Sequence, residues 1–420
     1  MAIVAGLSRR RPGALAAQPA APGTTQLTLP QALEQALARN RDLVVSRREL
    51  EVSRGRLRQA RLYPLNPELN VDGDAGLATA RGEGSERRGV GGGRIGLSQA
   101  IEVRGQRSLR VRGAEAEVAR SEWLLRDSER QVIADTTRVF SDLLVAQERL
   151  AVARDAVALA TELRSTADAL VESGTVPELD ALRAEVELRR ASNRVTLESA
   201  AVSSAIRALA FLIGAPAPGE LRASGPLLLE PLPGGLDELS ATARTQRPDV
   251  KAAEAAVAGA AANLALVRAE RFLPAVTASV SYGEGADFDS TNRRVLFGLS
   301  VPLPLWNRRE GDLAAAEAEL RKQEAQRDRL VAQVERDVIT AFQQFAASQR
   351  AVEDLLRRIL PAQEEAARLM QEGYRLGEFR LTEALQAQRD LIEGRGGYLE
   401  AVATYNAAAV ELRKALGARP

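Results

Sequence analysis

Gly174-Thr175-Val176-Pro177-Glu178-Leu179-Asp180-Ala181-Leu182 is matched by Gly377-Glu378-Phe379-Arg380-Leu381-Thr382-Glu383-Ala384-Leu385, which lies 203 residues further along the chain. Before each stretch comes a long sequence rich in Ala, Leu, Arg and Glu with almost no Gly or Pro, which indicates a long helix. A glycine directly after such a sequence ends the helix, so each match marks a tight turn. We therefore expect two helical hairpins: about Ser108 to Glu172 returning as Glu178 to Ile213, and about Glu310 to Glu372 returning as Leu381 to Leu416.

The duplication extends upstream, where Gly96-Leu97-Ser98 is echoed by Gly298-Leu299-Ser300. A period near half the chain is too long for a solenoid, whose repeats span about 20 to 50 residues. Two similar helical domains in tandem remain an alternative. The expected divisions are a leader that is disordered or follows a misassigned start, 1–26, a first repeat, 27–214, a Pro/Gly-rich linker, 215–235, a second repeat, 236–417, and a tail, 418–420. The linker is expected to form an irregular belt around the helices, with a disordered tether as the alternative.

Composition excludes most kinds of chemistry. The chain has no Cys and no His, which removes thiol catalysis, zinc sites built on these residues and His-based acid–base mechanisms. The formal net charge of +1 argues against a nucleic-acid partner, which would require a basic excess. No run of 18 apolar residues occurs, so no transmembrane helix is expected. Composition thus removes most enzyme classes and leaves only scattered carboxylates as candidate catalytic groups, so we expect a protein that is not an enzyme and has no cofactor or metal site.

Alternating apolar and polar residues follow the first helix of each half. Each run is about 10 to 13 residues long, enough for a tilted strand to cross an outer membrane. Polar, Gly-rich connections at 80–89 and 283–292 are typical of exposed loops. We expect the apolar face to meet lipid and the polar face to line a lumen; two solvent-covered hairpins on a soluble protein are the alternative. The residues expected to face lipid are Val276, Val280, Phe297 and Leu299, and those expected to face the lumen are Thr277 and Ser279.

Three aromatic residues, Tyr63, Phe272 and Trp306, fall at the strand ends nearest the helices, where an aromatic girdle would lie. Four strands cannot close into a barrel, and open strand edges are not tolerated in lipid. The membrane interpretation therefore requires an oligomer in which several chains share their strands.

The chain resembles a known family in three local motifs. These are Asn66-Pro67-Glu68-Leu69 at the start of the first strand, Val301-Pro302-Leu303-Pro304-Leu305-Trp306-Asn307-Arg308 after the fourth, and Tyr374-Arg375-Leu376-Gly377 at the second turn. Together with the doubled plan, they resemble the TolC-type outer-membrane efflux proteins over about residues 27 to 417. The first two motifs look most like the branch paired with cobalt-zinc-cadmium exporters of the resistance-nodulation-division type.

The resemblance implies a mainly α fold with a β-barrel part: a homotrimer whose twelve-stranded outer-membrane barrel continues as a periplasmic α-helical barrel. The implied partners are outer-membrane lipid, a periplasmic adaptor and an inner-membrane pump. The resemblance also implies a periplasmic gate at the helix tips around Gly174 and Gly377. Glu383 matches a ring aspartate, Asp180 an acidic gate residue and Tyr374 a gate tyrosine. The chain departs from the pattern at Phe379, where the best-known members have Arg, and at Gln386, where they have a second acidic ring.

The implied function is passive conduction in an efflux system, with heavy-metal cations as a candidate cargo. A periplasmic coiled-coil adaptor or a scaffold without a channel is the alternative. An adaptor should have one hairpin between compact β domains, and a scaffold would not need paired amphipathic strands. The sequence does not identify the exported substrate or the cognate pump.

Overall fold

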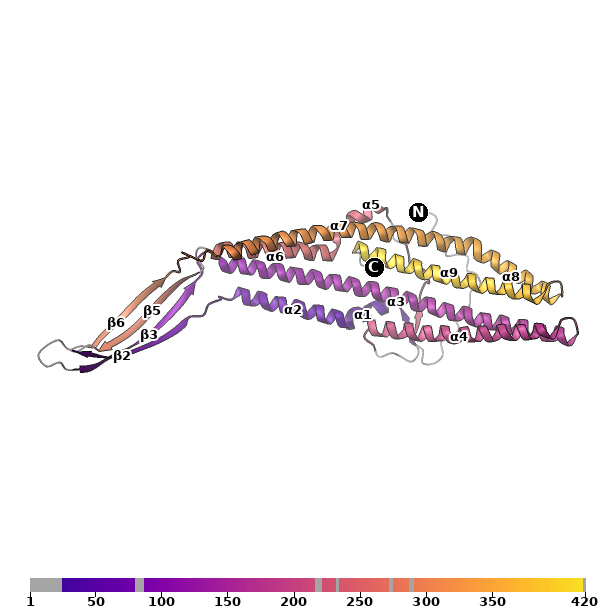
Figure 1. Cartoon of the computed structure of the whole chain (residues 1–420), viewed down its shortest axis with the longest axis horizontal. Coiled ribbons are helices and arrows are strands. Elements are labelled where there is room, and N and C mark those ends of the chain that lie inside the picture. The colour runs from indigo at the N-terminus through magenta and orange to yellow at the C-terminus, as the bar shows by residue number, and fades with distance from the viewer. Residues whose placement is uncertain are drawn as a thin grey trace. The chain divides into compact units, whose positions relative to one another are not determined.

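The computed structural model describes residues 25–79, 87–215, 221–231, 234–271, 275–286 and 291–417. Its elements follow one plan twice (Figure 1). The first half contains β1 (Thr25–Thr28), α1 (Leu29–Arg39), α2 (Arg41–Arg61), β2 (Glu68–Thr79), β3 (Arg87–Ile101), α3 (Gln106–Glu172) and α4 (Glu178–Leu212). The second half contains β4 (Leu221–Ser224), α5 (Leu236–Gln246), α6 (Pro248–Glu270), β5 (Val276–Ala286), β6 (Thr291–Ser300), α7 (Glu310–Asp354), the π-helical turn η2 (Leu355–Ile359), α8 (Leu360–Arg375) and α9 (Leu381–Leu416).

The expected long and returning helices are present, but the second long helix is not uniform. It changes to a π turn at η2, in which the Leu360 N–H donates to Leu355 O, five residues back. The next residue, Pro361, has no N–H to donate and would clash inside a regular helix. The wider π turn accommodates this proline. The sequence analysis did not predict the π turn.

The first helix of each half is also divided. Asn40 separates α1 from α2, and Arg247 separates α5 from α6; both have extended ψ angles, 133° and 127°. Arg247 precedes Pro248, and a residue before proline is disfavoured from helical geometry.

The chain divides into two compact units, which do not coincide with the two sequence repeats. One comprises Met1–Arg41, Val132–Leu232 and Phe342–Leu412, and the other Asp42–Gln131, Pro233–Ala341 and Arg413–Pro420. The first unit holds both hairpin turns and the second holds the long strands. Each repeat therefore contributes to both units.

The long strands form one antiparallel sheet in the order β2-β3-β5-β6 (Figure 1). Val280 pairs with Phe297 and Ser279 pairs with Gly298, so the predicted separation of apolar and polar residues on β5 and β6 is confirmed. The same alternation extends over β2 and β3, since Leu97 pairs with both Leu69 and Val280. The sheet therefore has one apolar and one polar face.

A second, two-stranded sheet was not predicted. β1 pairs in parallel with β4, from Thr25 opposite Leu221 to Thr28 opposite Ser224. β4 lies inside the linker that was expected to be irregular, and β1 begins before the expected end of the leader. The segment after β4 is also fixed to α9: Asn406 donates to Leu227 O at 2.7 Å and accepts from Leu229 N–H at 3.0 Å.

Two described helices, α4 and α6, are long and apolar enough to cross a membrane by length and composition alone, each with a mean hydropathy of 1.4. The sequence analysis missed them because it counted only uninterrupted apolar runs. Only 17% of each window is buried within the chain. In a single copy of the chain, most of the apolar surface of both helices is therefore exposed.

Candidate functional site

The two hairpin turns have the same backbone geometry. In each, a glycine with φ of 75° follows the helix, and this left-handed conformation costs a residue with a side chain about 1–2 kcal/mol. The hydrogen bonds are those of a Schellman motif, which satisfies the last carbonyls of the helix. They run from Gly174 to Val171 O at 2.9 Å, Thr175 to Leu170 O at 2.9 Å, Gly377 to Tyr374 O at 3.0 Å and Glu378 to Gly373 O at 2.9 Å. Gly174 and Gly377 therefore set equivalent tips.

Tyr374 is the centre of a small apolar core beside the second tip. It is 1% exposed and clusters with Leu163, Leu381, Ala384 and Leu385. Its hydroxyl has no hydrogen-bond partner within the described part of the chain. Burial raises the pKa of the Tyr374 hydroxyl, and the negative charge of Asp180 raises it further. The structure thus brings two predicted gate residues, from the two hairpins, into one electrostatic environment.

Phe379 lies against the last turn of α8. A methyl group added at Gly373 would lie 2.2 Å from Cδ2 of the Phe379 ring, so the ring requires glycine there. Phe379 is 40% exposed. An aromatic contact to the backbone thus exists at the position where the resemblance implied an arginine.

The other predicted gate residues form hydrogen bonds or ion pairs with residues close to them in the sequence. Glu383 is exposed and accepts the Arg380 N–H at 3.0 Å, which caps the start of α9. Gln386 donates to Asp390 at 2.7 Å on the same helix. Asp180, with 16% of its side chain exposed, lies 3.5 Å from Arg183. The helix-capping role of Glu383 could have been read from the sequence, because it stands three residues after Arg380, the residue directly before α9.

A groove of about 440 Å³ lies between α3, α4 and α9 in the unit that holds the tips. Its lining includes Ala156 and Leu399, both buried. Across it, Arg389 of α9 pairs with Glu187 of α4, which also pairs with Arg190 at 2.8 Å. The Arg389–Glu187 pair thus connects the two hairpins beside the apolar residues of the groove, while the Arg190–Glu187 pair lies within α4.

On the sheet, the apolar side chains are exposed. The following ten are between 41% and 83% exposed: Leu69, Val71, Leu77, Ile95, Leu97, Val280, Tyr282, Val295, Phe297 and Leu299. The opposite face is polar: Asn70 donates to Ser98 at 3.1 Å, and Asp72 lies 3.9 Å from Arg94. Such a two-faced sheet is what a membrane barrel requires of its wall.

Two of the three residues of the predicted aromatic girdle, Tyr63 and Trp306, lie within the described part of the chain. The Tyr63 hydroxyl donates to Ala100 O at 3.0 Å and so binds the end of β3. Trp306 is 92% exposed. Phe272 lies outside the described residues.

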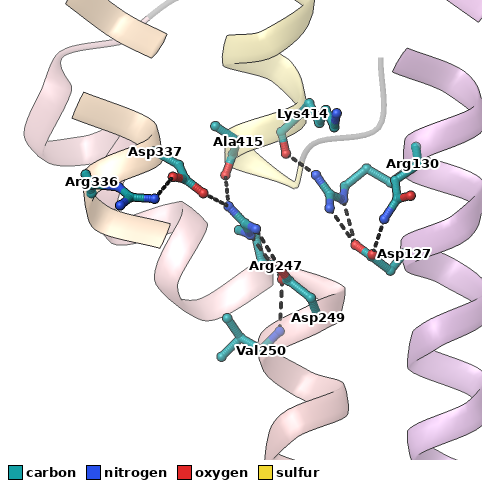
Figure 2. Close-up of polar contacts among 10 residues, drawn as sticks. Asp127, Arg130, Arg247, Asp249, Val250, Arg336, Asp337, Lys414 and Ala415 are labelled. Carbon is teal, nitrogen blue, oxygen red and sulfur yellow. Dashed lines mark hydrogen bonds and ion pairs between the residues drawn. The ribbon is translucent and has the colours of Figure 1, made fainter. Parts of the chain in front are cut away.

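A buried charge cluster that the sequence analysis missed joins α6 to the end of α9 (Figure 2). Arg247 donates to both carboxylate oxygens of Asp249, at 3.0 and 2.5 Å, and to Ala415 O at 3.4 Å. Arg130, held by Asp127 at 2.6 Å, donates to Lys414 O. Two guanidinium groups thus bind the carbonyls at the negative end of the α9 dipole.

The electrostatics of this cluster depend on Arg247, whose side chain is 8% exposed. Burial alone would raise the pKa of Asp249, but the hydrogen bonds and charge of Arg247 outweigh it and the pKa is lowered. Asp249 is therefore held as a carboxylate.

Among the described residues, no group of three or more acidic, His or Cys side chains could hold a metal ion. This result says nothing about a transported metal, which need not bind at a resident site.

Comparisons with known proteins agree with this geometry. Residues 32–215 and 239–418 match the model of the family "Outer membrane efflux protein". The cobalt-zinc-cadmium resistance protein CzcC of Cupriavidus metallidurans is 28% identical over 395 residues, covering 93% of this chain and 90% of CzcC. A crystal structure of CusC matches with a TM-score of 0.76 and 18% identity over 95% of both chains. The outer membrane protein VceC of Vibrio cholerae matches with a TM-score of 0.74 and 19% identity, over 93% of this chain and 96% of VceC.

The structural matches show that the chain has the fold of these proteins. The family match spans both halves and most of the chain. This protein therefore belongs to the outer membrane efflux proteins, the non-enzymatic TolC-type channels of the outer membrane.

Proposed function

We propose that three copies of this chain pool their sheets into one twelve-stranded barrel and conduct an exported substrate passively. The coarser statement follows from the family: the protein is an outer-membrane channel of tripartite efflux systems, whose members form trimeric channels. The proposal adds how this chain closes the barrel, what it carries and where it gates. A periplasmic adaptor and an inner-membrane pump would deliver the substrate and supply the energy.

The observation that carries the proposal is the two-faced sheet with two open edges. Among the described strands, β2 and β6 each have a neighbour on one side only. Unpaired backbone groups cost several kcal/mol each in lipid, so a single four-stranded sheet would not be stable there. Closure through further copies satisfies these edges and directs the polar face inward.

Mass measurement in mild detergent, combined with conductance in planar bilayers, tests this assembly. We expect a trimer that forms discrete conducting events. A stable monomer, or a trimer without conductance, would contradict the proposal.

Heavy-metal cations are the proposed cargo. The support is the similarity to CzcC, a cobalt-zinc-cadmium resistance protein, over nearly the whole of both chains. An export assay in a deletion strain should show accumulation of cobalt, zinc or cadmium that this protein reverses together with its cognate pump and adaptor. Export of organic solutes with no effect on these metals would assign a different cargo.

The proposed gate lies at the tips, with Asp180 and Glu383 each present three times around the axis of a trimer. Gathered carboxylates attract cations and repel one another. Single-channel recordings of Glu383→Gln and Asp180→Asn should show weaker cation selectivity and weaker block by multivalent cations. Recordings that match the unmodified channel would identify both as ordinary surface charges.

A periplasmic adaptor or scaffold is the other candidate function. The exposed apolar face of the sheet disfavours it, since a soluble protein rarely exposes an apolar patch of this kind without a partner. Purified protein that stays soluble and monodisperse without detergent would favour this second candidate.

A further inference from the structure

The polar face of the long sheet carries a row of charged residues that crosses all four strands (Figure 1). Asp72 of β2 pairs with Arg94 of β3. Arg94 pairs with Gly283 of β5, which in turn pairs with Arg294 of β6. We call these four residues the arginine row. The row holds two guanidinium groups and one carboxylate, so it has an excess of positive charge.

The neighbouring rows of the polar face leave this excess in place. The next row toward the helices has no charged side chain and consists of Asn70, Gly96, Ser281 and Leu296. The next row toward the loops has one, Asp74, which lies on β2 like Asp72. Arg294 is three strand spacings, about 14 Å, from β2. Exposed charges are screened beyond a Debye length of about 8 Å, so the carboxylates of the same sheet do not neutralise Arg294.

Neither arginine of the row is buried or tightly paired. Arg94 Nε lies 3.9 Å from Asp72 Oδ2, beyond hydrogen-bond distance, and 53% of the Arg94 side chain is exposed. Arg294 is exposed and has no ion pair with another described residue. A methyl group added at Gly283 would lie 3.6 Å from Arg94 Cβ. Because glycine has no such group, no side chain separates the two arginines, whose strands are about 10 Å apart.

This arrangement fits the chemistry of oxyanions. The planar guanidinium group donates paired hydrogen bonds to the oxygens of phosphate and similar anions. Arginine and lysine side chains line pores that select for anions. In a trimer the arginine row would occur three times around the lumen, with twice as many arginines as aspartates. The lumen wall at this level would therefore attract anions.

We propose that Arg94 and Arg294 form an oxyanion-binding site on the lumen wall, which takes inorganic phosphate, sulfate and short chains of phosphate groups. The site lies about 20 Å along the strand from its helix-side end, since Arg294 is six residues before Ser300 and a strand rises about 3.4 Å per residue. It raises the local concentration of anions in the outer part of the lumen and lowers that of free cations. The inference rests on the lumen-facing sheet of the proposed function and is independent of the cargo and of the carboxylates at the tips.

Block of the channel by inorganic tripolyphosphate tests the site. Single trimers are recorded in planar bilayers in potassium chloride, with tripolyphosphate on both sides. We expect tripolyphosphate to reduce the current of the unmodified channel. Arg294→Gln and Arg94→Gln should each raise the concentration for half block about tenfold, as expected when a charge-assisted hydrogen bond is lost. Arg294→Lys, which keeps the charge, should raise it less.

Arg293→Gln is the matched control. Arg293 is the adjacent residue of β6, lies on the apolar face and pairs with Glu284 at 3.3 Å. Its replacement should leave the concentration for half block unchanged. Equal shifts from Arg293→Gln and Arg294→Gln, or no block of the unmodified channel, would overturn the inference.

Asp72→Asn should change the block in the opposite direction. It removes the carboxylate nearest Arg94 and keeps both guanidinium groups, so the concentration for half block should fall about two- to fivefold. A purely structural role of the row predicts no such gain. A rise in the concentration for half block would show that the arginines do not bind the anion, which overturns the inference.

Calorimetric titration of tripolyphosphate into the same purified trimers measures binding without conductance. Trimers that bind it through Arg294 but do not conduct would contradict the proposed channel and support the site. Trimers that conduct, with neither block nor binding dependent on Arg94 or Arg294, would contradict the site alone. Loss of most trimers in Arg294→Gln, with unchanged binding by those that remain, would assign Arg294 to a contact with β2 of a neighbouring copy and overturn the inference.

Discussion

Phe297→Arg tests the assigned sheet faces most directly, with Leu296→Arg as its matched control. Phe297 is 83% exposed on the apolar face opposite Val280, whereas Leu296 is 47% exposed on the polar face opposite Ser281. An arginine on the lipid face near the bilayer midplane costs about 2–4 kcal/mol. An arginine directed into an aqueous lumen should change stability by no more than about 0.5 kcal/mol, as at other water-exposed positions.

Because 1.4 kcal/mol corresponds to a factor of ten, Phe297→Arg should lower the folding equilibrium constant by about 30- to 700-fold. The assay is reversible folding into phospholipid vesicles over a urea series, with the folded fraction read from heat-modifiable migration on gels. Leu296→Arg should fold like the unmodified chain. Equal losses from both substitutions would refute the two-faced wall, and a larger loss from Leu296→Arg would reverse the assigned faces.

Gly397→Ala should stabilise α9 by about 1 kcal/mol, because glycine is the weaker helix former and an added methyl meets no atom of the described part of the chain within 4 Å. Amide exchange around residue 397 should then slow about fivefold, whereas Gly373→Ala, whose methyl would meet the Phe379 ring at 2.2 Å, should not slow exchange at the second tip. Tyr374→Phe should raise the unfolding free energy by about 1 kcal/mol, since it removes a buried hydroxyl that has no hydrogen-bond partner among the described residues. A lower unfolding free energy, measured by chemical denaturation, would show that the hydroxyl does form a hydrogen bond. Asp249 has a lowered pKa, so its contribution to stability is present above its unfolded pKa of about 3.9 and is lost as the pH falls through the lower folded value. Asp249→Asn should therefore reduce the loss of unfolding free energy that the unmodified protein shows at acid pH. If the variant loses as much unfolding free energy at acid pH as the unmodified protein, Asp249 does not cause that loss.

Sequence patterns predicted the elements whose signals are local. Alternation over 276–282 and 295–299 predicted both strands and their shared face, because the period of two survives in any antiparallel pair. The glycines at the two tips predicted both turns, since the left-handed conformation favours that residue.

Features that depend on contacts distant in sequence were missed. β1 and β4 are four residues each and pair across almost half the chain, which no local pattern reveals. The contact between Arg247 and Ala415 O likewise joins residues 168 positions apart. The burial of Tyr374 beside Asp180 follows from the packing of two hairpins, so spacing alone could not have placed them together.

The two halves also show where the shared plan is not sufficient. Both tips keep the same turn, with the same glycine φ and equivalent hydrogen bonds, so this geometry is a requirement of the hairpin itself. The arms differ: α8 begins after a π turn with Pro361 beside it, and α9 contains Gly394, Gly396 and Gly397, whereas α4 runs for 35 residues without Gly or Pro.

Gln363, two residues after that proline, packs against Gly394, and Glu364 pairs with Arg395 at 3.0 Å. The interruptions in the two arms of the second hairpin therefore lie at the same level. Added methyl groups at Gly396 and Gly397 would meet no atom of the described residues within 4 Å, so packing among those residues does not explain either glycine. The first hairpin forms without such interruptions. The region around Pro361 and Gly394 is therefore a specific feature of the second hairpin and is not required for a hairpin to form. Local opening should consequently be easier there than at the corresponding level of α3 and α4.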